Sequence, residues 1–339
     1  GHSLLAVRLM AQIQQRFGQD LPLATLFQGA TIEHLASILR QQVMSRPHSP
    51  LVEIQAGVAP TETSSNASRE RRLPFFCVHP ADGTVLSYAD LAHQLGPDQP
   101  FYGLQAPGLD GEQEPYTQLE ALATHYLEAV CSVQPKGPYL LGGWSMGGVV
   151  AFEMAQQLQR QGQQVALLAL LDSWTPAALY NPDGPVGEDD TKLLVNFLAN
   201  LRGRFAKDLP ALPTDLEQLG PDEQLNYILE HAKLLEFLLP DMGLVQLYRL
   251  LQAFKSNVRA MWRYTPQLYP GQITLFQATQ QPDSANDGPA PGWFELSSQP
   301  IKVYPSPGDH YTMLTKPYVE ALAEQLRTCL DIAHPIQVK

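Results

Sequence analysis

The chain has 339 residues, 44% of them hydrophobic, which is enough to bury the core of one large domain and one small one. Its formal net charge of -12 argues against a nucleic-acid-binding surface, which normally carries a basic patch. The three cysteines, Cys77, Cys131 and Cys329, lie far apart, so they predict no disulfide framework and no metal site. The longest strongly apolar run, Val165–Leu171, is shorter than the ~20 residues of a membrane span. With no signal-peptide pattern at the start, we expect a cytoplasmic protein without a membrane segment.

The first 44 residues are typical of a small helical domain. Apolar residues recur at helical spacing over residues 4–17 and 31–43, and Thr31 suits the N-cap of the second helix. Two or three short helices bury little core by themselves. We therefore predict that residues 1–44 are the C-terminal part of a small helical domain whose first part precedes this sequence.

Residues 45–73 have the polar, Pro- and Ser-rich composition of a linker, and Leu51–Gln55 within them predicts the first strand of the next domain. From residue 74 to about 335, short apolar runs alternate with helical patterns, which predicts a mostly parallel sheet with helices on both faces. The further predicted strands are Phe75–Val78, Phe101–Gln105, Tyr139–Leu141, Val165–Leu171, Ile273–Gln277 and Ile301–Tyr304. The predicted helices are Val85–Leu95, Leu119–Val133, Met146–Gln161 and Lys316–Leu330.

The alternation of strands and helices stops between about residues 177 and 265. Helical patterns occur there at Lys192–Arg202, Asp222–Leu238 and Leu244–Tyr264. A helical insertion within an α/β sheet is typical of a lid that covers a site. We therefore predict a lid over residues 177–265.

Residues 143–147, Gly-Trp-Ser-Met-Gly, match the G-x-S-x-G pattern of a nucleophile elbow. The pattern alone is weak, but here an apolar strand precedes it and a helical pattern follows it. The glycines allow a sharp turn that exposes the Ser145 hydroxyl above the sheet. We predict Ser145 as a nucleophile; the alternative is a glycine-rich turn with a passive serine.

A serine hydroxyl becomes a good nucleophile only when a base accepts its proton. His310 follows the last predicted strand, where this type of fold places the base, and the other histidines fit that position less well. Asp172 directly ends the strand Val165–Leu171, and we predict it as the acid that orients the imidazole. Asp283, in a polar loop after the next strand, is the alternative acid.

The negative charge that develops on the substrate oxygen needs hydrogen-bond donors that are already in place. One predicted donor is the backbone N–H of Met146, at the start of a helix. The second is the backbone N–H of Ala81, in the loop 79–83 after a core strand. The alternative is that this segment is an ordinary strand-to-helix loop.

Together these segments resemble the terminal thioesterase domains of nonribosomal peptide synthetases and related polyketide synthases. The matching stretches are Phe75–Pro80, Gly142–Gly148, Leu170–Ser173 and Gly308–His310, within a resemblance over about residues 50–330. The resemblance implies an α/β-hydrolase fold with an inserted helical lid. It also implies an acid after the same strand as Asp172.

Residues 1–44 resemble the second half of a peptidyl carrier domain. Gly1-His2-Ser3 is similar to the end of the G-G-x-S attachment motif, although the first glycine and the first carrier helix are absent. The resemblance implies that Ser3 carries a covalent 4′-phosphopantetheine arm. Ser3 also starts a predicted helix, where a phosphodiester is favoured, and a plain N-cap serine is the alternative. On the predicted lid, Lys255 and Arg259 are more typical of a solvated face than of a site for the arm's phosphate.

We therefore predict a thioesterase that releases a carrier-bound peptidyl or acyl chain through an acyl-serine, by hydrolysis or macrocyclisation. The resemblance implies partners: upstream synthetase modules, in the same or a partner polypeptide, and a phosphopantetheinyl transferase. We expect no metal. Three alternatives stay open: an editing thioesterase, an ordinary esterase or lipase, and a catalytically inactive hydrolase-fold binding module. The fused segment 1–44 argues against the first two, and the set Ser145, Asp172 and His310 argues against the third.

Overall fold

The structure, a computed structural model, describes residues 9–10, 12–13, 21, 25–26, 31, 35, 49–57, 72–111, 113–177, 190–205, 244–280 and 292–334. Ser3, Asp283 and the helix predicted at Asp222–Leu238 lie outside these residues. Within the first 44 residues, the described side chains of Met10, Ile13, Leu21 and Leu35 are buried in one cluster, against which Leu26 packs.

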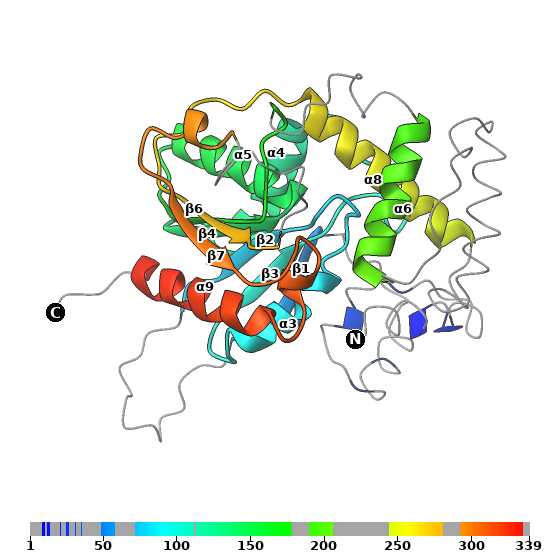
Figure 1. Cartoon of the computed structure of the whole chain (residues 1–339), viewed down its shortest axis with the longest axis horizontal. Helices are drawn as coiled ribbons and strands as arrows, with labels where there is room; N and C mark the ends of the chain where they lie inside the picture. Colours follow the sequence, from blue (N-terminus) through cyan, green and yellow to red (C-terminus); the bar gives the residue numbers. More distant parts are fainter. Residues whose placement is uncertain are drawn as a thin grey trace.

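A seven-stranded sheet forms the centre of the molecule, in the order β1-β3-β2-β4-β5-β6-β7 (Figure 1). β1 pairs antiparallel with β3, and the other neighbouring strands pair in parallel, so the predicted mostly parallel α/β sheet is confirmed. The strands are β1 (Leu51–Gln55), β2 (Phe75–Val78), β3 (Phe101–Leu104), β4 (Tyr139–Trp144), β5 (Val165–Leu171), β6 (Ile273–Ala278) and β7 (Lys302–Ser306). Because parallel strands end at the same edge, the carboxyl ends of β2, β4, β5 and β6 form one rim, where ligands of open α/β sheets bind.

Helices cover both faces of this sheet. Figure 1 shows α4 and α5 on one face and α3 and α9 on the other. The alternating side chains of β4 explain both layers, because Leu141 belongs to the cluster that contains α5, whereas Leu140 belongs to the cluster that contains α9. The helices are α3 (Ala89–Gln94), α4 (Leu119–Val133), α5 (Met146–Arg160), α6 (Asp190–Phe205), α8 (Leu244–Arg263) and α9 (Val319–Ala333), with short 3-10 helices η2 (Leu86–Tyr88), η5 (Phe294–Leu296) and η6 (Thr312–Leu314).

Most elements begin or end within a few residues of the predicted positions, and three of the differences have a clear physical reason or change the element itself. β4 continues beyond Leu141 through Gly142 and Gly143 to Trp144. Glycines weaken the sequence pattern of a strand, but close packing requires one here, because a Cβ on Gly142 would lie 2.4 Å from the Phe75 ring. The segment predicted as one helix at Val85–Leu95 divides into η2 and α3. The last helix begins after Pro317, because proline disfavours the helical conformation in the residue before it.

The inserted helices α6 and α8 pack against each other beside the α/β body (Figure 1). Their apolar contact is made by Leu193, Leu194, Phe197, Leu247, Leu251, Phe254 and Val258. At its edge, the Asp190 carboxylate accepts from Lys255 at 3.2 Å and from Arg259 at 2.5 Å. Burial raises the pKa of Asp190, but the two cations outweigh burial and hold the pKa below its ordinary value. Lys255 and Arg259 therefore join α8 to α6 through partly exposed ion pairs to Asp190.

The chain after α8 is held to the body by a buried hydrogen bond from the Tyr264 hydroxyl to Glu153 Oε2, at 2.7 Å. Tyr264→Phe leaves the buried carboxylate without this donor, so we expect the free energy of unfolding to fall by about 1–3 kcal/mol. Urea denaturation measures this loss. The matched control is Tyr248→Phe on α8, where 52% of the residue is exposed and the change should stay within about 0.5 kcal/mol. Equal effects of the two substitutions would contradict this role of Tyr264.

Candidate active site

Ser145 occupies a tight turn between β4 and α5. Its backbone has φ 57° and ψ -127°, a conformation that non-glycine residues adopt only where the surroundings enforce it. The Ser145 N–H donates to the Leu171 carbonyl at 3.0 Å, which ties the turn to the end of β5. A Cβ on Gly143 would lie 2.1 Å from the Gly147 backbone, and one on Gly147 would lie 2.2 Å from the Val78 carbonyl oxygen. The strand, turn and helix predicted around Ser145 are therefore present, and close backbone approach requires both glycines.

The structure brings His310 and Asp172 together. His310 Nδ1 lies 2.6 Å from Asp172 Oδ2. Asp172 is buried, and its other carboxylate oxygen accepts from the Ala278 N–H at 2.9 Å, while its own N–H donates to the Phe276 carbonyl at 2.7 Å. These bonds to β6 fix the carboxylate. Because Nδ1 donates to Asp172, the neutral imidazole keeps Nε2 without a proton, which is the tautomer a general base needs.

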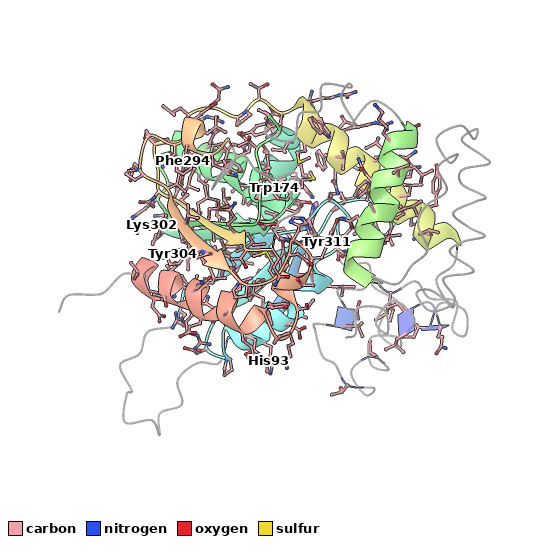
Figure 2. All side chains as sticks on the ribbon, viewed as in Figure 1. His93, Trp174, Phe294, Lys302, Tyr304 and Tyr311 are labelled. Atoms are coloured by element: carbon pink, nitrogen blue, oxygen red, sulfur yellow. The ribbon has the colours of Figure 1, made fainter. Side chains whose placement is uncertain are left out.

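Two indole rings pack near the imidazole of His310. The Trp144 ring lies 5.1 Å away at 35°, and the Trp174 ring lies 5.1 Å away at 20°. The Trp144 indole N–H also donates to the His310 carbonyl at 3.0 Å, and the Tyr311 ring meets the imidazole edge-on at 5.1 Å. In the view of Figure 2, Trp174 and Tyr311 lie nearer to α6 and α8 than Phe294, Lys302 and Tyr304 do. Trp174 was not predicted from the sequence, where its one signal is its place two residues after the proposed acid.

The loop after β2 is held by His79. Its Nδ1 lies 2.7 Å from the Pro80 carbonyl oxygen, and its Nε2 lies 2.6 Å from the Tyr126 hydroxyl. A carbonyl can only accept, so Nδ1 carries the proton and Nε2 accepts from Tyr126. Burial lowers the pKa of His79 to about 4, although the bond to Pro80 opposes this, so the ring is neutral at ordinary pH. His79 therefore serves as a fixed support of the loop.

The two proposed oxyanion donors lie on segments that share one anchor. The Tyr88 hydroxyl donates to the Val78 carbonyl and accepts from the Trp144 N–H at 3.0 Å, so it joins the ends of β2 and β4. Ala81 follows the first of these ends, and Met146 begins α5 after the second. The N–H groups in the first turn of a helix have no intrahelical acceptor, which leaves that of Met146 available for a substrate oxygen. Tyr88 was not singled out from the sequence, because nothing in its local pattern marks this contact.

The fold and this rim of polar residues define an α/β-hydrolase of the serine-hydrolase class. A family model described as "Thioesterase domain" matches residues 73–330, and one described as "Phosphopantetheine attachment site" matches residues 1–39. The chain belongs to the thioesterase domain family, with a phosphopantetheine attachment region before that domain. It is therefore a thioesterase, as predicted.

The most similar proteins include large synthetases. The chain is 32% identical over 326 residues to a dimodular nonribosomal peptide synthase of Bacillus subtilis (strain 168), which covers 96% of this chain and 12% of the relative. It is 42% identical over 173 residues to malpibaldin synthetase of Mortierella alpina, covering 51% of this chain and 3% of the relative. The chain therefore spans only a small part of these curated relatives.

Solved structures show the same likeness. A holo four-domain nonribosomal peptide synthetase bound to AMP and glycine aligns with a TM-score of 0.73 at 30% identity, over 99% of this chain and 24% of that one. The NocB thioesterase domain, in covalent complex with a fluorophosphonate nocardicin G analogue, aligns with a TM-score of 0.54 at 26% identity, over 78% of this chain and 97% of that one. Among the residues that the structure describes, no helix has both the length and the hydropathy to cross a bilayer.

The pKa of His79 predicts a loss of stability in acid. Its folded-state value of about 4 lies below the ordinary 6.5, so between these pH values the unfolded chain binds the proton and the folded protein does not. We expect this one group to remove up to about 3 kcal/mol from the free energy of unfolding as the pH falls through that window. Urea denaturation at a series of pH values should show a smaller acid-dependent loss for His79→Gln. The same slope in both proteins would contradict this assignment.

The stacked Trp174 ring predicts an effect on turnover. Trp174→Leu removes one wall of the imidazole, so we expect kcat for a thioester substrate to fall about tenfold, because a less fixed base transfers protons less well. The control is Phe294→Leu, an exposed aromatic residue away from His310, with kcat changed by less than about twofold. Turnover of a model thioester measures both. An unchanged kcat in Trp174→Leu would show that Trp174 does not position His310 for catalysis.

Proposed function

We propose that the chain releases a carrier-bound peptidyl or acyl chain from a nonribosomal peptide or hybrid polyketide assembly line, through an acyl intermediate on Ser145. The observation that carries this proposal is the Asp172–His310 hydrogen bond. Asp172 directly follows β5, and the Ser145 N–H donates to the last carbonyl of β5, so the three residues belong to one rim of the sheet. This arrangement has the parts of a nucleophile–base–acid triad. The phosphopantetheine attachment region and the likeness to synthetases support a carrier-bound substrate.

In the proposed reaction, His310 Nε2 accepts the Ser145 proton while Oγ attacks the thioester carbon. The carbonyl oxygen becomes negatively charged and accepts hydrogen bonds from the Ala81 and Met146 N–H groups. When the tetrahedral intermediate collapses, the carbon–sulfur bond breaks and the His310 imidazolium donates its proton to the leaving thiolate. Asp172 holds the ring and stabilises its positive charge between these two steps.

The second half of the reaction releases the chain from Ser145. His310 removes a proton from water, or from an amine or hydroxyl of the bound chain, and that group attacks the ester carbon. The same two N–H groups stabilise the second oxyanion, and Ser145 regains its proton from His310. Water gives a free acid, and an internal nucleophile gives a ring. The proposed lid over residues 177–265, to which α6 and α8 belong, shapes this choice.

We further propose the carrier as residues 1–44, the linker as 45–73 and the thioesterase as 74–335, with Ser3 as the attachment residue for 4′-phosphopantetheine. That group supplies the thiol on which the chain arrives as a thioester. Because Ser3 lies outside the described residues, no step above depends on its geometry. Upstream synthetase modules and a phosphopantetheinyl transferase are the proposed partners, and the cytoplasm is the proposed compartment, in keeping with three free thiols. An attachment region on the same chain favours product release over editing in trans.

Intact mass spectrometry with a peptidyl N-acetylcysteamine thioester tests this function. We expect an acyl adduct that maps to Ser145, followed by a product whose mass shows hydrolysis by the gain of water and cyclisation by its absence. Ser145→Ala should form no adduct, whereas Ser132→Ala, at an exposed serine of α4, should form it at the normal rate. Adduct formation by Ser145→Ala would overturn the proposal.

A further inference from the structure

Helix α8 contacts two loops at the carboxyl rim of the sheet. The Ser256 hydroxyl donates to the Tyr116 carbonyl at 2.7 Å, in the loop before α4. The next residue, Asn257, donates from its side-chain amide to the Ala81 carbonyl at 3.0 Å, in the loop after β2. Ala81 also packs against the apolar cluster that α6 and α8 share. The inserted helices therefore touch the residue to which the second oxyanion donor is assigned.

The contact from Asn257 is a buried one. The residue is only 3% exposed, and a polar side chain of this kind costs free energy on burial unless it is hydrogen-bonded. Its amide nitrogen also lies 3.6 Å from the place where a Cβ on Gly83 would be, so it lies close against the loop backbone. A larger side chain at Gly83 would therefore approach this amide.

Asn257 completes the restraint of Ala81 from both sides. On the N-terminal side, the Pro80 carbonyl accepts from the Gly83 N–H at 2.9 Å and from His79 Nδ1 at 2.7 Å. That carbonyl belongs to the same planar peptide as the Ala81 N–H, so these bonds fix the plane of the proposed donor. On the C-terminal side, the Ala81 carbonyl belongs to the next peptide, and Asn257 fixes that plane. Together the bonds restrict both backbone dihedral angles of Ala81.

We propose that Asn257 is a positioning residue for the oxyanion hole: by holding the Ala81 carbonyl, it directs the Ala81 N–H and makes catalytic competence depend on the seating of α8 against this loop. The inference rests on the proposed function, in which the Ala81 and Met146 N–H groups bind the oxyanion. Such donors stabilise the transition state because they are fixed before the charge develops, and a donor free to rotate loses this advantage.

The test compares three variants by single-turnover acylation with the peptidyl thioester. Asn257→Leu keeps the approximate volume of the side chain but has no hydrogen to donate to Ala81. Asn257→Ala removes the group. Ser256→Ala is the matched control, because it deletes a hydrogen bond from α8 to a different loop. We expect both Asn257 variants to acylate Ser145 about 10–100-fold more slowly, with KM within about threefold of the wild-type value. In Ser256→Ala, neither the acylation rate nor KM should change by more than about threefold.

A second measurement separates positioning from general loosening of the fold. A peptidyl trifluoromethyl ketone forms a tetrahedral oxyanion with the active-site serine, so its affinity should fall by the same factor as the acylation rate in both Asn257 variants. Thermal unfolding reports any stability loss shared with Ser256→Ala. Acylation and ketone affinity equal to those of Ser256→Ala would overturn the role of Asn257. Absence of any Ser145 adduct in the wild-type protein would instead overturn the proposed function, and this inference with it.

Discussion

The site depends on backbone hydrogen bonds that continue the sheet one residue beyond the ends of its parallel strands. His79 donates to the Leu104 carbonyl of β3, Ser145 to the Leu171 carbonyl of β5, and Asp172 to the Phe276 carbonyl of β6. Each proposed functional segment is therefore positioned by the neighbouring strand and not by its own loop alone. Parallel pairing places all these ends at one edge, so residues far apart in sequence meet there.

The site includes backbone conformations with positive φ, which non-glycine residues rarely adopt. Among the described residues, the two non-glycine residues with positive φ are Ser145 and Asp172, the proposed nucleophile and acid. Such conformations persist only where the surroundings determine them, and here glycine packing and backbone bonds on both sides do so. The indoles of Trp144 and Trp174 both pack near the imidazole of His310, and the Tyr88 hydroxyl links the strand ends that carry both proposed oxyanion donors.

Periodicity predicted most of the fold, and the elbow pattern predicted Ser145 in its turn, because both are local properties of the sequence. The Asp172–His310 contact followed from the order of strands. Trp174, Tyr88 and Asn257 escaped prediction because their roles arise from tertiary contacts that no spacing marks. The same reason applies to Lys255 and Arg259: helical spacing places them on one face, but only the packing of α6 shows that this face pairs with Asp190.

The central claim is that Ser145, His310 and the Ala81 and Met146 N–H groups act on one reacting carbonyl. The most direct measurement is a high-resolution crystal structure of the protein after reaction with a peptidyl fluorophosphonate, whose phosphonyl oxygen takes the place of the oxyanion. We expect phosphorus bonded to Ser145 Oγ, with that oxygen about 3 Å from both backbone nitrogens and the Asp172–His310 bond intact. A phosphonyl group on another residue, or an oxygen turned away from both nitrogens, would contradict the account.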